Sequence, residues 1–302
     1  MASAVATSVP ERGGAPWTEE RTPLRRRARD SIFWWAAGFG LLLLVVPLAW
    51  VLAGVIEKGV GSWRWSMLTH TTAAGGLSNA IVGTLLLLLG VVIVAGSVGI
   101  GCGIYIAELA PARIRPVLQG ASEVLSGVPS IVIGYVAYVS LVIGLHWGYS
   151  LVAAVLALSV LVIPYVTKAT ELAISRVPVA YREGGEALGM TRTQVLRKIV
   201  LRSSIPGIST GLIVALAISV GETAPLLYTI AFTNSYPSLA LTHSSAGYLT
   251  YVAYQFFDQP AARDQNLAHA AALVLVVMVL GLILLGRLVV RLTQRYSETR
   301  SR

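Results

Sequence analysis

Residues 181–206 read YREGGEALGMTRTQVLRKIVLRSSIP, a polar and basic stretch that lies between two long apolar segments of the chain. Gly189 follows Glu183 at a spacing that predicts a short helix, a tight turn and a second helix. Gly184 and Gly185 would allow the first helix to approach another surface closely. We therefore expect a helical loop that connects two membrane spans, although a plain amphipathic surface helix would have a similar composition.

The composition of the whole chain is that of an integral membrane protein. Of its 302 residues, 55% are hydrophobic and only 12% are charged, whereas soluble domains carry about 25% charged residues. The net charge of +9 could suit nucleic acid, but the arginines flank apolar segments, as membrane topology requires. We therefore expect contact with membrane lipid and none with nucleic acid. The single cysteine, Cys102, excludes an intramolecular disulfide.

The apolar segments predict an all-α protein with six transmembrane helices, because each is long enough to cross about 30 Å of hydrocarbon. They span residues 31–56, 80–106, 117–145, 150–175, 204–231 and 268–290. Residues 31–295 would form the membrane domain, with a cytoplasmic loop at 176–203, a disordered basic tail at 1–30 and a short tail at 296–302. Of the 23 Lys and Arg residues, nineteen fall on the side of the N-terminus and three on the other, which predicts that both termini are cytoplasmic.

The longer of the two long outer loops, residues 232–267, carries a helically spaced stripe of aromatic side chains. We interpret the stripe as an aromatic belt at the membrane interface, with a docking surface for an extracytoplasmic partner as the alternative. The stripe consists of Tyr248, Tyr251, Tyr254, Phe256 and Phe257.

Four ionisable side chains fall within the predicted spans: Glu123, Lys168, Glu171 and Glu222. A charge at the centre of a bilayer costs at least about 2.5 kcal/mol, so each of them needs a partner or a function. Lys168 and Glu171 are three residues apart and therefore share one helix face. They either form a pair within the helix, with Lys168 extended to the membrane surface, or line the path of an anion.

Glu222 and Thr223 lie between Gly221 and Pro225, where we expect the fifth span to be kinked or unwound. A carboxylate at this depth would repel a bare dianion but would accept an anion that keeps a proton. Alternatively, Glu222 pairs with a basic residue on a partner helix.

Span three contains a second expected break, at Gly127 and Pro129. Ser126 and Ser130 flank this break with hydroxyl groups. Interrupted helices often mark the binding region of a transporter, whereas small residues in ordinary close packing are the alternative explanation.

Motifs for catalysis are absent from the sequence. The lysines are Lys58, Lys168 and Lys198, and none lies in the Gly-Lys-Ser/Thr context of a P-loop. There is also no nucleophile–base pair and no metal-ligand cluster. We therefore expect no catalytic residue, no bound metal and no cofactor on this chain, so that any ATP would be hydrolysed by another subunit.

The loop from Glu183 to Leu201 resembles the EAA loop of bacterial ABC importer permeases, although Arg202 replaces the usual proline after Leu201. The runs LSGVPSIVIG at 125–134 and GETAPLLY at 221–228 resemble the PstA family of phosphate ABC transporter permeases. The runs GGLSNAIVG at 75–83 and GIYIAE at 103–108 agree with this resemblance, which covers about residues 75–290.

The resemblance implies a six-span, type I (MetI-like) permease subunit of the bacterial plasma membrane that carries inorganic phosphate inward. It implies four kinds of partner: a PstC-like permease, two PstB-like ATPases that bind ATP and Mg²⁺, and an extracytoplasmic PstS-like phosphate-binding protein. Glu183, Gly184, Gly185 and Gly189 would then form the element that docks into the ATPase.

In the family, a basic and an acidic residue of span four are tied to transport, and they correspond to Lys168 and Glu171. Lysine stands here in place of the more usual arginine, and Ile218 occupies a position where some members carry arginine. Together with Glu222, Thr223, Ser126 and Ser130, this pair forms our set of candidate residues for the translocation path.

Two other functions remain as alternatives. One is a permease for another oxyanion, sulfate or molybdate, against which the GETAP sequence argues. The other is an ion-coupled secondary transporter that works alone, against which the EAA-like loop argues.

Overall fold

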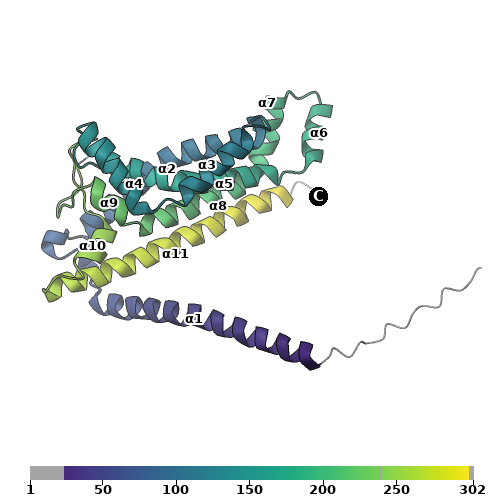
Figure 1. Ribbon diagram of the computed structural model, residues 1–302. Coiled ribbons are helices and arrows are strands. Elements are labelled where there is room, and N and C mark those ends of the chain that lie inside the picture. Colours follow the sequence, from purple (N-terminus) through teal and green to yellow (C-terminus); the bar gives the residue numbers. More distant parts are fainter. Residues whose placement is uncertain (1–23, 239, 299–302) are drawn as a thin grey trace, which may run out of the picture. The chain divides into compact units, whose positions relative to one another are not determined.

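The computed structural model describes residues 24–238 and 240–298, and the architecture of this range is helical (Figure 1). The elements are α1 (Leu24–Ser62), η1 (Trp65–Leu68), η2 (Thr72–Ala74), α2 (Ser78–Ile104), η3 (Tyr105–Leu109), α3 (Arg115–Ser126), α4 (Ser130–Ala137), η4 (Tyr138–Gly144), α5 (Leu151–Ser175), α6 (Val179–Ala187), α7 (Arg192–Val195), η5 (Leu196–Val200), α8 (Leu201–Gly221), α9 (Ala224–Thr229), α10 (Leu249–Gln255) and α11 (Ala262–Glu298). The expected disordered tail lies largely outside the described residues.

The chain divides into two compact units, Met1–Ala53 and Gly54–Arg302. In the first unit the described part is one continuous helix, residues 24–53 of α1, with Pro47 inside it. The second unit contains all the later elements and every residue discussed below.

In the part of the chain that the structure describes, five helical segments are long and apolar enough to cross a membrane, and they confirm the predicted all-α membrane fold. They are Ser31–Ser62, Ser78–Leu109, Leu151–Ser175, Arg192–Gly221 and Ala262–Arg291. The third predicted span differs, because it is a pair of helices, Arg115–Ser126 and Ser130–Gly144, bent by 94°. The bend lies at Gly127 and Pro129, where the sequence predicts a break.

The centre of the second unit is α5, which packs against α2 on one side and α8 on the other (Figure 1). Glycines permit the close approach: a Cβ added to Gly103 would lie 2.5 Å from Thr170 Cβ, and one added to Gly207 would lie 2.6 Å from Ala173 Cβ. Such small-residue contacts are the usual way in which membrane helices pack tightly. Leu158 of α5 is 1% exposed and belongs to the largest apolar core.

The aromatic stripe of the outer loop belongs partly to the protein interior. Tyr248 is buried, and the ring of Tyr251 stacks on Phe232 with 4.2 Å between the ring centroids. The interpretation as an interfacial belt is therefore wrong for Tyr248, because this side chain is buried in the protein, where its ring contacts that of Phe232. Tyr254 and Phe257 are exposed, as a belt would require.

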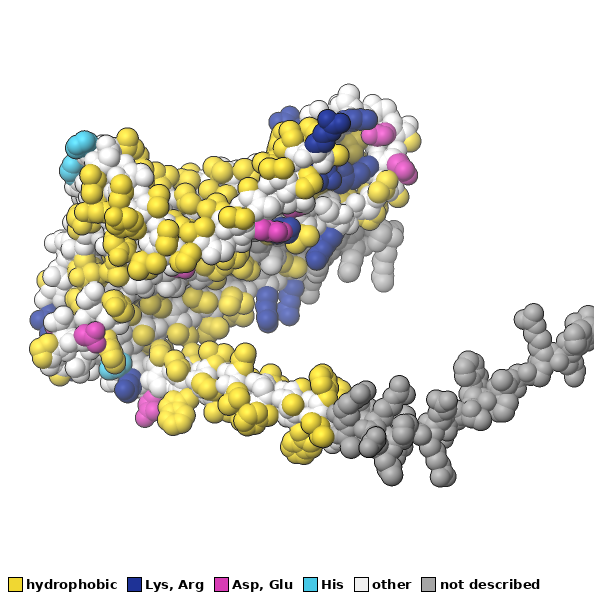
Figure 2. Space-filling view, in the orientation of Figure 1, with side chains coloured by type: hydrophobic (Ala, Val, Ile, Leu, Met, Phe, Trp, Pro, Cys, Tyr) yellow, Lys and Arg dark blue, Asp and Glu magenta, His cyan; other side chains and the backbone are white. Residues whose placement is uncertain are grey.

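The two ends of the bundle differ in character. α6 and α7 lie together at one end, and α9 and α10 lie at the other (Figure 1). Lys and Arg side chains gather around α6 and α7, whereas hydrophobic side chains cover much of the visible face between the two ends (Figure 2). The charge distribution thus marks the α6–α7 end as the polar end of a membrane-embedded bundle.

Candidate functional site

A cluster of polar side chains joins α3 to α5, within two of the segments that are apolar enough to span a membrane. Lys168 Nζ lies 3.4 Å from Glu123 Oε1 and 3.9 Å from Glu171 Oε2. Gln119 Nε2 donates a hydrogen bond to Glu171 Oε1. We call these four residues the Lys168 cluster. Lys168 lies seven residues before the end of α5 at Ser175, which is about 10 Å along the helix axis at 1.5 Å per residue.

The Lys168 cluster combines one ammonium with two carboxylates whose environments differ. The side chain of Glu171 is 11% exposed, whereas those of Lys168 and Glu123 are 44% and 69% exposed. Charges that face lipid are costly, so exposed ions at this depth require water or another protein surface beside them. The pair of Lys168 and Glu123 therefore faces a place that this chain does not fill.

The structure bears on whether Lys168 is paired only within its own helix. The pair with Glu171 within α5 exists, but the shorter contact of Lys168 is with Glu123 on a different helix. The ammonium is thus held between helices. Gln119 was missed from the sequence, because an amide in an apolar helix gives no periodic or charge pattern that points to a carboxylate 52 positions away.

Glu222 lies at the predicted helix break. α8 ends at Gly221, Glu222 is extended with φ −74° and ψ 129°, and Thr223 precedes the first turn of α9. The carbonyl oxygen of Glu222 accepts a hydrogen bond from Thr250 Oγ1 at 3.1 Å. Among the described side chains, those of residues 31–238 and 240–291, no ion pair involves the half-buried carboxylate of Glu222.

The structure does not bring Glu222 and Lys168 together. Ser204 Oγ of α8 hydrogen-bonds the carbonyl of Ala173 in α5 at 3.3 Å, which fixes the level at which the two helices meet. Counting along each helix from that point at 1.5 Å per residue separates the two side chains by about 20 Å along the bundle. Glu222 and Lys168 therefore lie at two different levels along the axis of the helix bundle.

Ser126 and Ser130 flank the 94° bend between α3 and α4. Ser126 Oγ donates to the carbonyl of Glu123 at 2.8 Å, one turn earlier in α3. This bond uses the hydroxyl hydrogen locally and leaves the oxygen lone pairs exposed at the last residue of the helix.

The loop between α5 and α8 has the predicted form of a helix, a turn and a second helix. Gly189 has φ +77°, a left-handed conformation that glycine adopts without strain, and it separates α6 from α7. Glu183 and Gly184 are exposed on α6. Gly185 is buried instead, because a Cβ there would lie 2.7 Å from Ile199 Cδ1, so its close contact is made within this chain.

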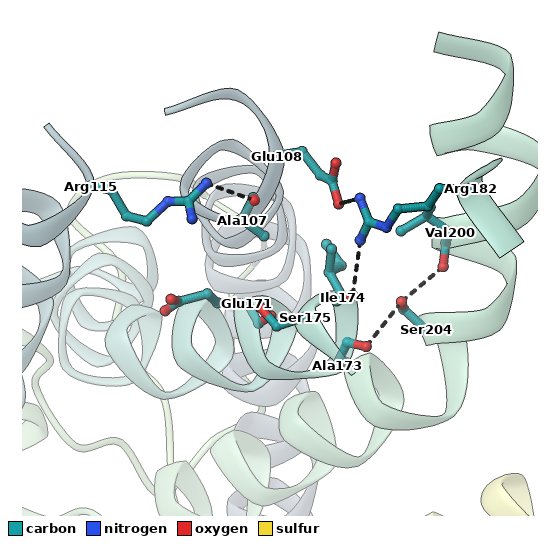
Figure 3. Close-up of polar contacts among 10 residues, drawn as sticks. All are labelled: Ala107, Glu108, Arg115, Glu171, Ala173, Ile174, Ser175, Arg182, Val200 and Ser204. Carbon is teal, nitrogen blue, oxygen red and sulfur yellow. Dashed lines mark hydrogen bonds and ion pairs between the residues drawn. The ribbon is translucent and has the colours of Figure 1, made fainter. Parts of the chain in front are cut away.

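Arg182 of α6 connects the loop to the ends of two spans (Figure 3). Its Nη1 lies 2.5 Å from Glu108 Oε1 in η3, and its Nη2 donates to the carbonyl of Ile174 at 3.3 Å, in the last turn of α5. We call Arg182, Glu108 and the Ile174 carbonyl the Arg182 junction. Both charged residues are visible in the sequence, but their pairing could not be predicted because they lie 74 positions apart.

The sequence is similar to those of known transport proteins. A family model described as "binding-protein-dependent transport system inner membrane component" matches residues 99–298. The chain is 49% identical over 273 residues to "Phosphate transport system permease protein PstA 2" of Mycobacterium tuberculosis (strain CDC 1551 / Oshkosh), covering 90% of this chain and 91% of that protein. It is 35% identical over 257 residues to "Phosphate transport system permease protein PstA" of Yersinia pestis, covering 83% of this chain and 85% of that protein.

Among solved structures, the fold is similar to a chain of the inward-facing MetNI methionine ABC transporter in its CY5 native crystal form. The TM-score is 0.58 at 18% identity, covering 76% of this chain and 99% of that chain. At this level of identity the similarity concerns the fold alone.

Proposed function

The chain belongs to the family of binding-protein-dependent transport system inner membrane components, and from this membership we propose that it carries inorganic phosphate inward as the permease subunit of an ATP-driven importer. It is a multi-pass protein of the plasma membrane. The observation that carries the choice of phosphate is the near-complete match to relatives named as phosphate transport system permeases.

Energy for transport would come from another subunit, since the sequence contains no P-loop. α6, with Glu183 and Gly184 exposed on it, would dock into an ATPase of the PstB kind that binds ATP and Mg²⁺. A PstC-like permease would complete the membrane part with two such ATPases below it, and a PstS-like binding protein would deliver phosphate from outside.

The orientation follows from the charges. Lys and Arg side chains gather at the α6–α7 end (Figure 2), and positive residues are retained on the cytoplasmic side of membrane proteins. This end, together with both termini, would therefore face the cytoplasm, where the ATPases are. The α9–α10 end would face the binding protein.

Lys168 would supply the positive charge that a phosphate anion meets on its way. The Lys168 cluster contains two carboxylates, so its formal charge is negative while Glu123 remains in place, and a second anion would be repelled. Phosphate would therefore have to take the position of Glu123 beside Lys168. Exposed ion pairs are worth at most about 1 kcal/mol, so this exchange has a low cost.

Transport by the reconstituted complex tests the proposal. The chain, the second permease, the ATPases and the binding protein are placed in proteoliposomes with ATP, and uptake of radiolabelled phosphate and sulfate is compared. We expect phosphate uptake that requires ATP and every subunit. Preferred uptake of sulfate, or phosphate uptake by this chain alone, would contradict the proposal.

A further inference from the structure

The guanidinium of Arg182 is in contact with two other elements at once. Nη1 is paired with Glu108 at the end of the span that α2 begins, and Nη2 is bonded to the Ile174 carbonyl at the end of α5 (Figure 3). A guanidinium is planar and carries five donors, so it can hold both partners in a fixed geometry, which a lysine ammonium cannot reproduce.

The Arg182 junction is partly buried, unlike the other basic groups of the loop. The side chains of Arg182 and Glu108 are 27% and 17% exposed. Arg192, Arg197 and Lys198 are exposed. Loss of one partner from this partly buried pair leaves the other charge without its partner, so Arg182 and Glu108 are expected to move together.

The junction also reaches both helices that hold the Lys168 cluster. Ile174 follows Glu171 by three residues in α5. Arg115, the first residue of α3, donates through Nη2 to the carbonyl of Ala107 at 3.1 Å, next to Glu108 in η3 (Figure 3). These contacts form a continuous path from α6 to α5 through Ile174 and, through η3, to α3.

We infer that the Arg182 junction transmits the movement of α6 on the ATPase to the walls of the Lys168 cluster, which makes Arg182 and Glu108 positioning residues for transport. The inference rests on the proposed function. When α6 moves, α3 and α5 shift relative to each other, and the contact between Glu123 and Lys168 opens or closes. ATP hydrolysis is thereby linked to the availability of Lys168.

The test measures transport per ATP hydrolysed in the full reconstituted complex. Arg182→Gln and Glu108→Gln should leave the ATPase bound and hydrolysing ATP, while phosphate uptake per ATP falls at least about 5-fold, the lower end of usual coupling between linked sites. Arg182→Lys should give an intermediate ratio, because it keeps the charge but not the fork. Arg113→Gln, an exposed arginine at the same end of the bundle, is the matched control and should keep the wild-type ratio.

The possible outcomes distinguish a failure of this inference from a failure of the proposed function. A wild-type complex that takes up no phosphate contradicts the proposed function. A wild-type complex that transports, with unchanged uptake per ATP in the Gln variants, contradicts the junction alone. Loss of the ATPase from both Gln variants would show that the pair only shapes the docking surface, which also contradicts transmission. If the Gln variants do not reach the membrane, a wild-type ratio in Arg182→Lys contradicts the two-point contact and an intermediate ratio supports it.

Discussion

Lys168 Nζ on α5 lies 3.4 Å from Glu123 Oε1 on α3, so a carboxylate of this chain occupies the position that we propose for a phosphate oxygen. Glu171 has a donor of its own in Gln119, whereas within the described residues the carboxylate of Glu123 contacts Lys168 alone. Glu123 is therefore the member of the Lys168 cluster that an anion could replace without disturbing the packing of α5.

Replacement of Lys168 tests its role directly. Lys168→Gln should reduce phosphate uptake in proteoliposomes at least about tenfold at equal expression, since a contact to a charged group is worth about 1.5–3 kcal/mol. Lys168→Arg should retain part of the uptake, because it keeps the charge. Lys58→Gln, an exposed lysine of α1, serves as the control. Near-normal uptake by Lys168→Gln would show that the lysine has only a structural role.

Removal of the competing carboxylate should have the opposite effect on binding. Glu123→Gln is expected to lower the Kd of phosphate up to about 5-fold, since an exposed ion pair is worth at most about 1 kcal/mol. The measurement is equilibrium dialysis of radiolabelled phosphate against the purified permease complex without the binding protein. Glu57→Gln, at another exposed carboxylate, should leave the Kd unchanged. Weaker binding to Glu123→Gln would mean that Glu123 helps to hold the anion.

The paired glycines of α6 should respond in opposite ways to alanine. A Cβ on Gly184 meets nothing within 4 Å, so Gly184→Ala should stabilise the helix by about 0.5–1 kcal/mol. A Cβ on Gly185 would lie 2.7 Å from Ile199 Cδ1 and 3.0 Å from Val195 Cγ2, so Gly185→Ala should loosen α6 from α7 and η5. Hydrogen–deuterium exchange of peptides from α6 should slow in the first variant and accelerate in the second. The same change in both would contradict this packing.

Glu222 is expected to lie against the second permease, because it is half-buried at the helix break and has no ion pair in the described part of this chain. Glu222→Gln should weaken the association of the two permeases, measured by their co-purification in detergent, if the charge balances a partner arginine. A variant that assembles normally but no longer prefers phosphate over sulfate would assign the charge to substrate selection instead. Normal assembly with normal selectivity would leave Glu222 with neither role.

The sequence predicted those features that depend on local chemistry. Hydropathy was sufficient for the membrane helices, and the breaks at Gly127 and Gly221 followed from glycine and proline, whose backbone preferences act wherever they occur. The tight turn at Gly189 was predicted from its spacing after Glu183, and the structure adds that this glycine is left-handed. The angle of the bend in span three was not predicted. The direction of α4 depends on its packing against α9, and a local sequence pattern carries no information about that contact.

The contacts that define the candidate site are distant in sequence and could not be predicted from it. Glu123 and Lys168 are separated by 45 positions, and Glu108 and Arg182 by 74. Each was recognisable as a charge in or beside a span, yet the choice of partner depends on which helices pack together. Tyr248 shows the reverse error, since helical spacing in an outer loop is equally compatible with burial and with exposure to the membrane surface.

The close packing of α5 against α2 and α8 decides where a solute can pass. The cavity among these helices, lined in part by Leu88, Leu158 and Val220, has a volume of about 10 Å³, room for a single water molecule at most. With Gly103 and Gly207 already at contact distance, this interior cannot admit an anion with even a partial hydration shell. Under the proposed function, an anion would therefore pass along the outer face of this chain beside Lys168, and a second protein would form the opposite wall of the path.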